Sequence, residues 1–100
     1  MREQPTRTNS KERSEEFGRF HIDAHQTDDE VVVIADTPGV SKDDLVAGID
    51  QKTTDLVLGK NGTGRYRVIL PWDSVEVTKA WFNNGVLEIR LQPDQSQYNP

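Results

Sequence analysis

The sequence lacks cysteine, long apolar runs and an excess of apolar residues. Without cysteine, the 100-residue chain can form no disulfide and has no thiolate metal ligand or thiol nucleophile. Its longest apolar run, Val31 to Ala35, is far too short to span a bilayer. Hydrophobic residues make up 33% of the chain, which indicates a small core or a part outside it. No apolar stretch follows the charged N-terminus, so we expect no signal peptide and a cytoplasmic protein.

Positive charge is also scarce. Twelve lysines and arginines face 17 aspartates and glutamates, which gives a formal net charge of −5. Because phosphate recognition needs a basic face, we expect neither nucleic acid nor a membrane surface as the partner.

Both ends of the chain are poor in large apolar residues. Residues 1–16 contain only Met1 of that kind, and their charges balance. Such a segment buries too little surface to offset its ordering entropy, so we predict disordered tails at 1–16 and 94–100. The foldable domain is then residues 17–93, which carry most of the net charge.

Within that domain, apolar side chains alternate with polar ones, which is typical of β-strands. The alternation is clearest at Phe20–Ala24 and Val86–Leu91, and a β-branched run lies at Val31–Ala35. Shorter strands are expected at 45–49, 55–58, 66–70 and 80–82, with tight turns at Asn61-Gly62 and around Asn84. Six or seven short strands without a helical pattern predict an all-β, antiparallel β-sandwich.

Several motifs add a family resemblance. The block from Ala80 to Leu87 contains Asn84, Gly85 and Val86 in the pattern Ala-x-x-x-Asn-Gly-Val-Leu, which is similar to the signature of the small heat shock (α-crystallin) family. An acidic turn with Pro38 and Gly39 precedes Asp44-Leu45, and Leu70-Pro71 ends a strand, in the same order as in that family. The resemblance implies an immunoglobulin-like sandwich, the α-crystallin domain, over 17–93.

The amino-acid sequence of the Ala80–Leu87 block resembles archaeal members of this family most, among them gas-vesicle accessory protein H. Three features depart from the small heat shock pattern. Only seven residues, 59–65, stand where microbial members place a swapped strand; residues 1–16 form no apolar arm; and 95–98 contain no Ile-x-Ile anchor. We therefore expect a monomer or small dimer rather than a large oligomer.

The resemblance implies an ATP-independent chaperone (a holdase) that binds unfolded or assembling proteins. Two alternatives remain open: a dedicated interaction or assembly accessory of the gas-vesicle type, which the missing arm favours, and a co-chaperone of the CS-domain class. The family's groove implies binding at Val46, Ile49, Ala80 and Trp81. Strand alternation leaves open which face Ile49 and Ala80 serve. Trp72, in a turn after Pro71, is a further candidate because tryptophan is enriched in binding hot spots; its alternative is to cap the sandwich.

No pattern favours catalysis or a cofactor. The serines at 41 and 74 lack a nucleophile-elbow pattern, and no carboxylate pair stands out. In His21-x-Asp23-x-His25 the two histidines would lie about 13 Å apart on an extended strand, so a solvated face is favoured over a metal site. The glycine-rich segment 59–64 has its lysine in the wrong order for a phosphate loop and predicts a hairpin.

Overall fold

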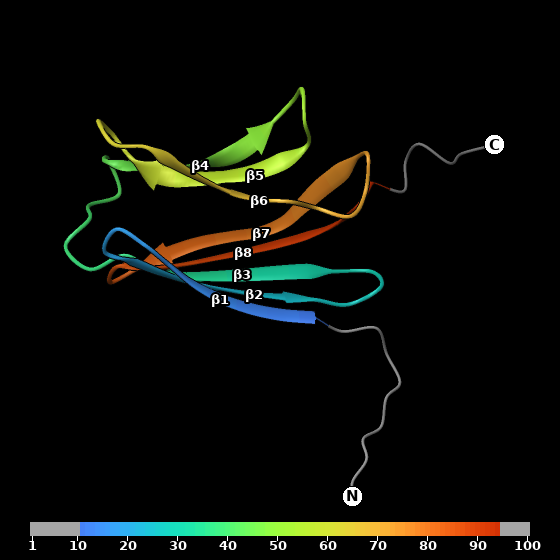
Figure 1. The fold of residues 1–100 in the computed structure, drawn as a ribbon, viewed down its shortest axis with the longest axis horizontal. Coiled ribbons are helices and arrows are strands. Elements are labelled where there is room, and N and C mark those ends of the chain that lie inside the picture. The colour runs from blue at the N-terminus through green and yellow to red at the C-terminus, as the bar shows by residue number, and fades with distance from the viewer. Residues whose placement is uncertain (1–10, 95–100) are drawn as a thin grey trace, which may run out of the picture.

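Eight strands joined by short connections make up residues 11–94, the part of the chain that the computed structural model describes (Figure 1). They are β1 (Lys11–Phe17), β2 (Phe20–Gln26), β3 (Val31–Asp36), β4 (Leu45–Asp50), β5 (Asp55–Lys60), β6 (Arg65–Val68), β7 (Val75–Asn83) and β8 (Val86–Pro93). Within these residues there is no helix long and apolar enough to cross a membrane.

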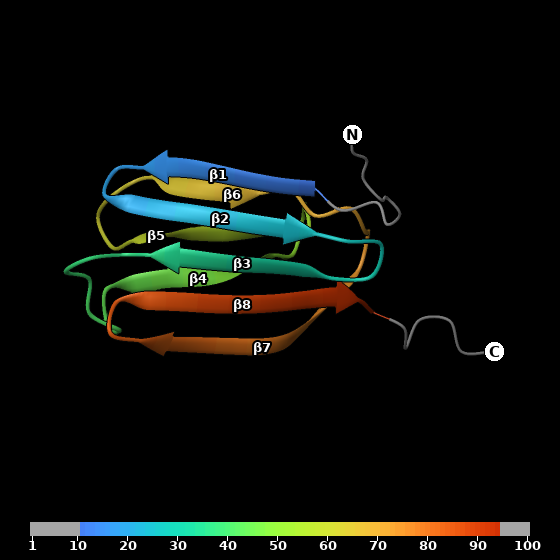
Figure 2. The ribbon, with the colours of Figure 1, turned by 90° about the horizontal axis from the view of Figure 1, so that it is seen from below.

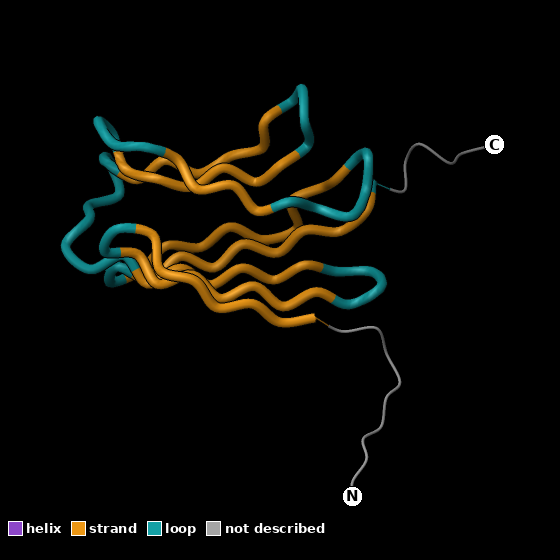
Figure 3. The backbone as a smooth tube through the Cα atoms, viewed as in Figure 1, coloured by secondary structure: helices purple, strands orange, loops and turns teal. Residues whose placement is uncertain are grey.

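The strands form two antiparallel sheets of unequal width. The larger sheet has five strands in the order β1-β2-β3-β8-β7, and the smaller has three in the order β4-β5-β6. The sheets lie one above the other, and Figure 2 shows the larger sheet in front of the smaller one. Turns and loops join the strands at the two ends of the sheets (Figure 3). The prediction of an all-β, antiparallel fold is confirmed.

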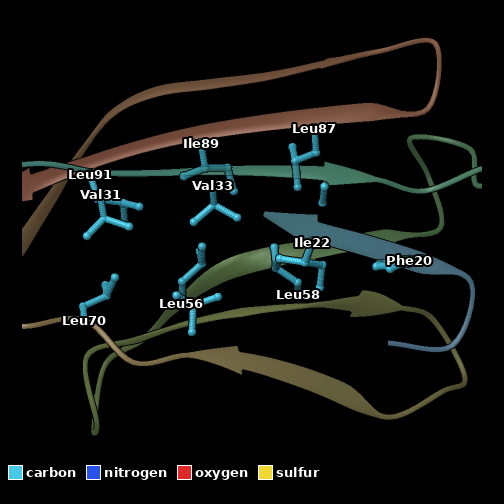
Figure 4. Packing of buried hydrophobic residues seen from close by; sticks show 12 residues of the cluster. Phe20, Ile22, Val31, Val33, Leu56, Leu58, Leu70, Leu87, Ile89 and Leu91 are labelled. Carbon is cyan, nitrogen blue, oxygen red and sulfur yellow. The ribbon is translucent and has the colours of Figure 1, made fainter. Parts of the chain in front are cut away.

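The core lies between the sheets, where the alternating apolar residues meet (Figure 4). On neighbouring strands of the larger sheet the buried residues are in register: Ile22 pairs with Ala35, which pairs with Leu87. Leu56 and Leu58 of β5 reach the same core from the smaller sheet. Complete burial of side chains of this size contributes about 1.5–3 kcal/mol each. The core members are Phe20, Ile22, Val31, Val33, Ala35, Leu56, Leu58, Val68, Leu70, Leu87, Ile89 and Leu91.

The N-terminal boundary differs from the prediction. Residues 11–16 were expected in a disordered tail, but they form strand β1, which pairs along its whole length with β2 from Lys11↔Gln26 to Phe17↔Phe20. At the other end, the backbone N–H of Asp94 donates to the Ser74 carbonyl oxygen at 3.0 Å. The rest of the two expected tails, residues 1–10 and 95–100, lies outside the described residues.

The turn residues of the motifs lie where the chain reverses. Asn84 and Gly85 form the turn between β7 and β8, both with positive φ (51° and 79°). Pro38 and Gly39 lie in the loop that follows β3, before the turn from Ser41 to Leu45. Positive φ favours glycine, and asparagine more than most other residues. The Asn84-Gly85 pair therefore suits its turn by backbone conformation.

Candidate functional site

Strand β7 is an edge strand that the smaller sheet leaves partly uncovered. Its inward-facing residues pair with the buried core residues of β8: Val77 with Leu91 and Ala80 with Ile89. Yet Val77 is 45% exposed and Ala80 is also exposed, whereas their β8 partners are buried. Because the smaller sheet has only three strands, its side chains do not extend over this edge. The result is an apolar strip beside backbone groups that pair with no further strand in residues 11–94.

The outer face of β7 carries the largest exposed aromatic side chain. Trp81 is 57% exposed and pairs with Glu88 of β8. Glu88 accepts a hydrogen bond from Arg90 Nε at 2.7 Å and lies 3.4 Å from Lys79 Nζ. The hydrogen bond from Arg90, and then the Lys79 charge, lower the pKa of Glu88, so this carboxylate stays ionised. Trp81 is thus an apolar side chain beside the charged side chains of Glu88, Arg90 and Lys79.

Strand β4 is the corresponding edge of the smaller sheet. Ile49 packs partly buried against the core, and so does Leu45. Val46 is half-buried and is not part of the apolar cluster. Since side chains alternate along a strand, Ile49 faces the larger sheet and Val46 faces away from it.

The structure therefore distributes the five residues implied by the resemblance over more than one surface. Ile49 and Ala80 lie on the inner faces of their strands, whereas Val46 and Trp81 lie on outer faces of different sheets. Trp72 is half-buried and packs against the core. Ala80 and Trp81 are nevertheless neighbours, because they are consecutive residues of the edge strand β7. Their side chains lie on opposite faces of the same stretch of backbone.

The opposite edge of the larger sheet, β1, is chemically different. Five of its seven residues are charged, in contrast to two of the nine in β7. Two of its glutamates bind the histidines of β2: Glu16 Oε2 lies 2.6 Å from His21 Nδ1, and Glu12 Oε2 lies 2.8 Å from His25 Nδ1. The hydrogen bond with Glu16 is the main cause of a raised pKa at His21, and Asp23 adds to it.

Tyr66 contacts the side of β1 that faces the smaller sheet. Its hydroxyl donates to Glu15 Oε1 at 3.0 Å and accepts from Arg13 Nη2 at 3.3 Å, and its ring lies 5.6 Å from that of Phe17. Charged side chains on an edge strand discourage further pairing. Of the two edges of the larger sheet, β7 is thus the one with an apolar, unblocked surface.

Sequence reasoning missed β1 and Val77. The Phe17-Gly18 pair before the β2 pattern is the signal that could have indicated a hairpin, since Gly18 has a φ of +59°. For Val77, no local signal was available, because its exposure follows from the widths of the two sheets.

Over residues 11–94, these features define an all-β protein whose larger sheet has an apolar edge at β7. The chain belongs to the GvpH family, whose model matches residues 2–99.

Two relatives are named gas vesicle proteins. Gas vesicle protein H of Haloferax mediterranei is 44% identical over 73 residues, which are 72% of this chain and 34% of that protein. Gas vesicle protein H1 of Halobacterium salinarum is 41% identical over 63 residues, which are 63% of this chain and 35% of that protein. The chain thus spans about a third of the length of the curated relatives that it matches.

These comparisons correct the main functional expectation. The prediction of a holdase was wrong. The matching family and both relatives are gas vesicle protein H, and they support the gas-vesicle alternative instead. The broader small heat shock family and the CS-domain alternative receive no such support. Both relatives come from haloarchaea, which is consistent with the archaeal type that the Ala80–Leu87 block indicated.

Proposed function

We propose that this chain is a gas-vesicle-associated accessory protein that binds one dedicated protein partner. The observation that carries the proposal is the match of the GvpH family to nearly the whole chain, residues 2–99. An accessory role needs a binding surface rather than a catalytic centre, and the β7 edge is such a surface.

Strand addition is the binding mode that suits this edge. An extended partner segment would pair with the free backbone groups of β7 and continue the larger sheet. Its side chains would then meet both faces of β7: Val77 and Ala80 on the inner side and Trp81 on the outer side. Of the five predicted residues, this mode uses Ala80 and Trp81, and Ile49 faces the larger sheet from β4. Val46 and Trp72 have no part in it.

The test is pairwise binding between this chain and each gas vesicle protein of Haloferax mediterranei, prepared separately. We expect one of them to bind and the others not. A Val77→Glu, Ala80→Glu double variant should abolish that binding, because inward-pointing charges on an edge strand oppose strand addition. The matched control is Ile69→Glu, which alters a residue that is 64% exposed on the connection after β6.

The proposal fails if a folded sample binds none of these proteins. It also fails if the double variant and the Ile69→Glu control weaken binding equally, since the effect would then not belong to the β7 edge. Circular dichroism of each variant checks that the fold is intact.

We also infer that the two sheets form the immunoglobulin-like sandwich of the α-crystallin type. Support comes from the family motifs at the turns, with Pro38-Gly39 after β3 and Asn84-Gly85 between β7 and β8. Superposing an experimental structure of this chain on an α-crystallin domain would test it. A different strand order in the two sheets would overturn the inference.

A further inference from the structure

A cavity of about 480 Å³ lies at one end of the two sheets. Its walls come from three connections: the β1–β2 turn, the loop after β3 and the turn between β5 and β6. The first belongs to the larger sheet and the last to the smaller one, so the cavity lies at the open end between the layers. Its size is within the range of ordinary ligand pockets.

The cavity has an apolar interior. Phe20, a core residue that is 5% exposed, forms part of its lining together with Phe17 and Val40. Phe17 is held in place by edge contact with Phe20 (ring centroids 6.4 Å apart) and by contact with Tyr66. These rings give an occupant a fixed apolar surface.

Two cationic side chains, Arg19 and Lys60, complete the lining. Neither makes an ion pair with any residue in the described range 11–94. No aspartate or glutamate is among the described residues that line the cavity. In a chain with a net charge of −5, two cations without a carboxylate partner beside an apolar cavity favour an anionic ligand.

We propose that this cavity binds the C-terminal end of a partner protein whose last residue is apolar. The side chain would occupy the space lined by Phe17, Phe20 and Val40, and the terminal carboxylate would pair with Arg19 and Lys60. A chain end combines both chemistries in one residue, and capture of terminal carboxylates is a known recognition mode.

The position of the cavity favours a chain end over an internal segment. Turns from both sheets line the cavity, and the buried core residue Phe20 forms part of its wall. A chain end that enters between the turns would place its last side chain against Phe20. No described residue of β7 lines the cavity, so this site is separate from the β7 edge and does not depend on the gas-vesicle role.

The test uses short acetylated peptides that end in Leu and the ¹⁵N-labelled full chain. We expect a peptide with a free terminal carboxylate to shift the amide signals of Gly18 and Gly39, which line the cavity. The same peptide with an amidated end should bind roughly tenfold more weakly, the usual effect of losing a charge-assisted hydrogen bond. Arg19→Gln and Lys60→Gln should each weaken the free acid by a similar factor.

Lys52→Gln is the matched control, because it removes the same charge from the β4–β5 turn, at the opposite end of β5 from Lys60. The proposal is overturned if acid and amide bind equally, or if the Lys52 variant weakens binding as much as the other two. It is also overturned if only a peptide with an internal glutamate and an amidated end binds, or if no peptide shifts Gly18 or Gly39. Unchanged β8 amide signals in each variant verify the fold.

Discussion

Thr37 donates two hydrogen bonds to the carbonyl oxygen of Gly85, one from its backbone nitrogen at 2.7 Å and one from Oγ1 at 2.9 Å. Thr37 is completely buried. The contact joins the loop after β3 to the turn between β7 and β8, two motifs that lie 48 positions apart. Both motifs therefore meet at one structural contact, which gives Gly85 a role in the fold.

Replacement of Gly85 by alanine should destabilise the fold by about 1–3 kcal/mol. The φ of +79° is unfavourable for any residue with a Cβ, and that Cβ would lie 3.4 Å from the Thr37 carbonyl oxygen. Urea denaturation measures the loss. The control is Gly48→Ala in β4, where φ is not positive and a Cβ meets nothing within 4 Å. Equal midpoints for the two variants would contradict this account of the turn.

The stability of the protein should depend on pH through His21. Its pKa is raised in the folded state, chiefly by the hydrogen bond with Glu16, and Ser14 and Asp23 also face the ring. Asp36 is its register partner on β3. A raised folded-state pKa contributes stability that is fully present below the unfolded pKa of about 6.5 and is lost as pH rises through the folded value.

The urea midpoint of the wild type should therefore fall between about pH 6 and pH 8, relative to that of His21→Gln. Glu16→Gln serves as the control, since it keeps the histidine but removes the main cause of the shift. A parallel pH dependence in all three proteins would rule out His21 as the source.

Tyr66→Phe should loosen β1 selectively. The change removes the hydrogen bonds with Glu15 and Arg13 but keeps the ring contact with Phe17. Burial, and then the Glu15 hydrogen bond, raise the pKa of Tyr66, so its hydroxyl remains a donor at neutral pH. A net loss of about 1 kcal/mol would speed hydrogen exchange in β1 about fivefold. Unaltered hydrogen exchange in β1, or an equal acceleration in β3 and β8, would show that the Tyr66 hydroxyl does not selectively stabilise β1.

Trp81→Ala should weaken binding of the proposed partner by about 2 kcal/mol or more while leaving the free energy of unfolding within about 0.5 kcal/mol of wild type. The reason is that the side chain is 57% exposed and is not part of the core cluster. Calorimetric titration measures the first quantity and urea denaturation the second. Ile69→Ala, another exposed apolar residue, is the control. If partner affinity is unchanged in a folded Trp81 variant, Trp81 has no part in the site.

The core strands could be predicted from the sequence because their signal is local. In β2 and β8 apolar residues alternate with polar ones, and β3 is a continuous apolar run; the structure buries Ile22, Val33 and Ile89 from these three strands. Alternation along a strand places Trp81 on the face opposite that of its neighbour Phe82. Phe82 does pack against the core.

Strand β1 could not be predicted in this way. Its own side chains bury little, and its contacts come from His21, His25 and the distant Tyr66. The exposure of Ala80 was equally out of reach, because it depends on how many strands lie across from β7. Trp72 lies in a turn, where no alternation tells whether a side chain folds back onto the core.

The unlike edges of the larger sheet limit how copies or partners can add to it. A partner strand that joins β7 uses the apolar edge, and the β1 edge at the other side presents charged side chains that are engaged with β2 and Tyr66. Under the proposed binding mode, we therefore expect strand addition to this sheet at β7 and not at β1. A complex formed in this way would end at β1 rather than continue past it.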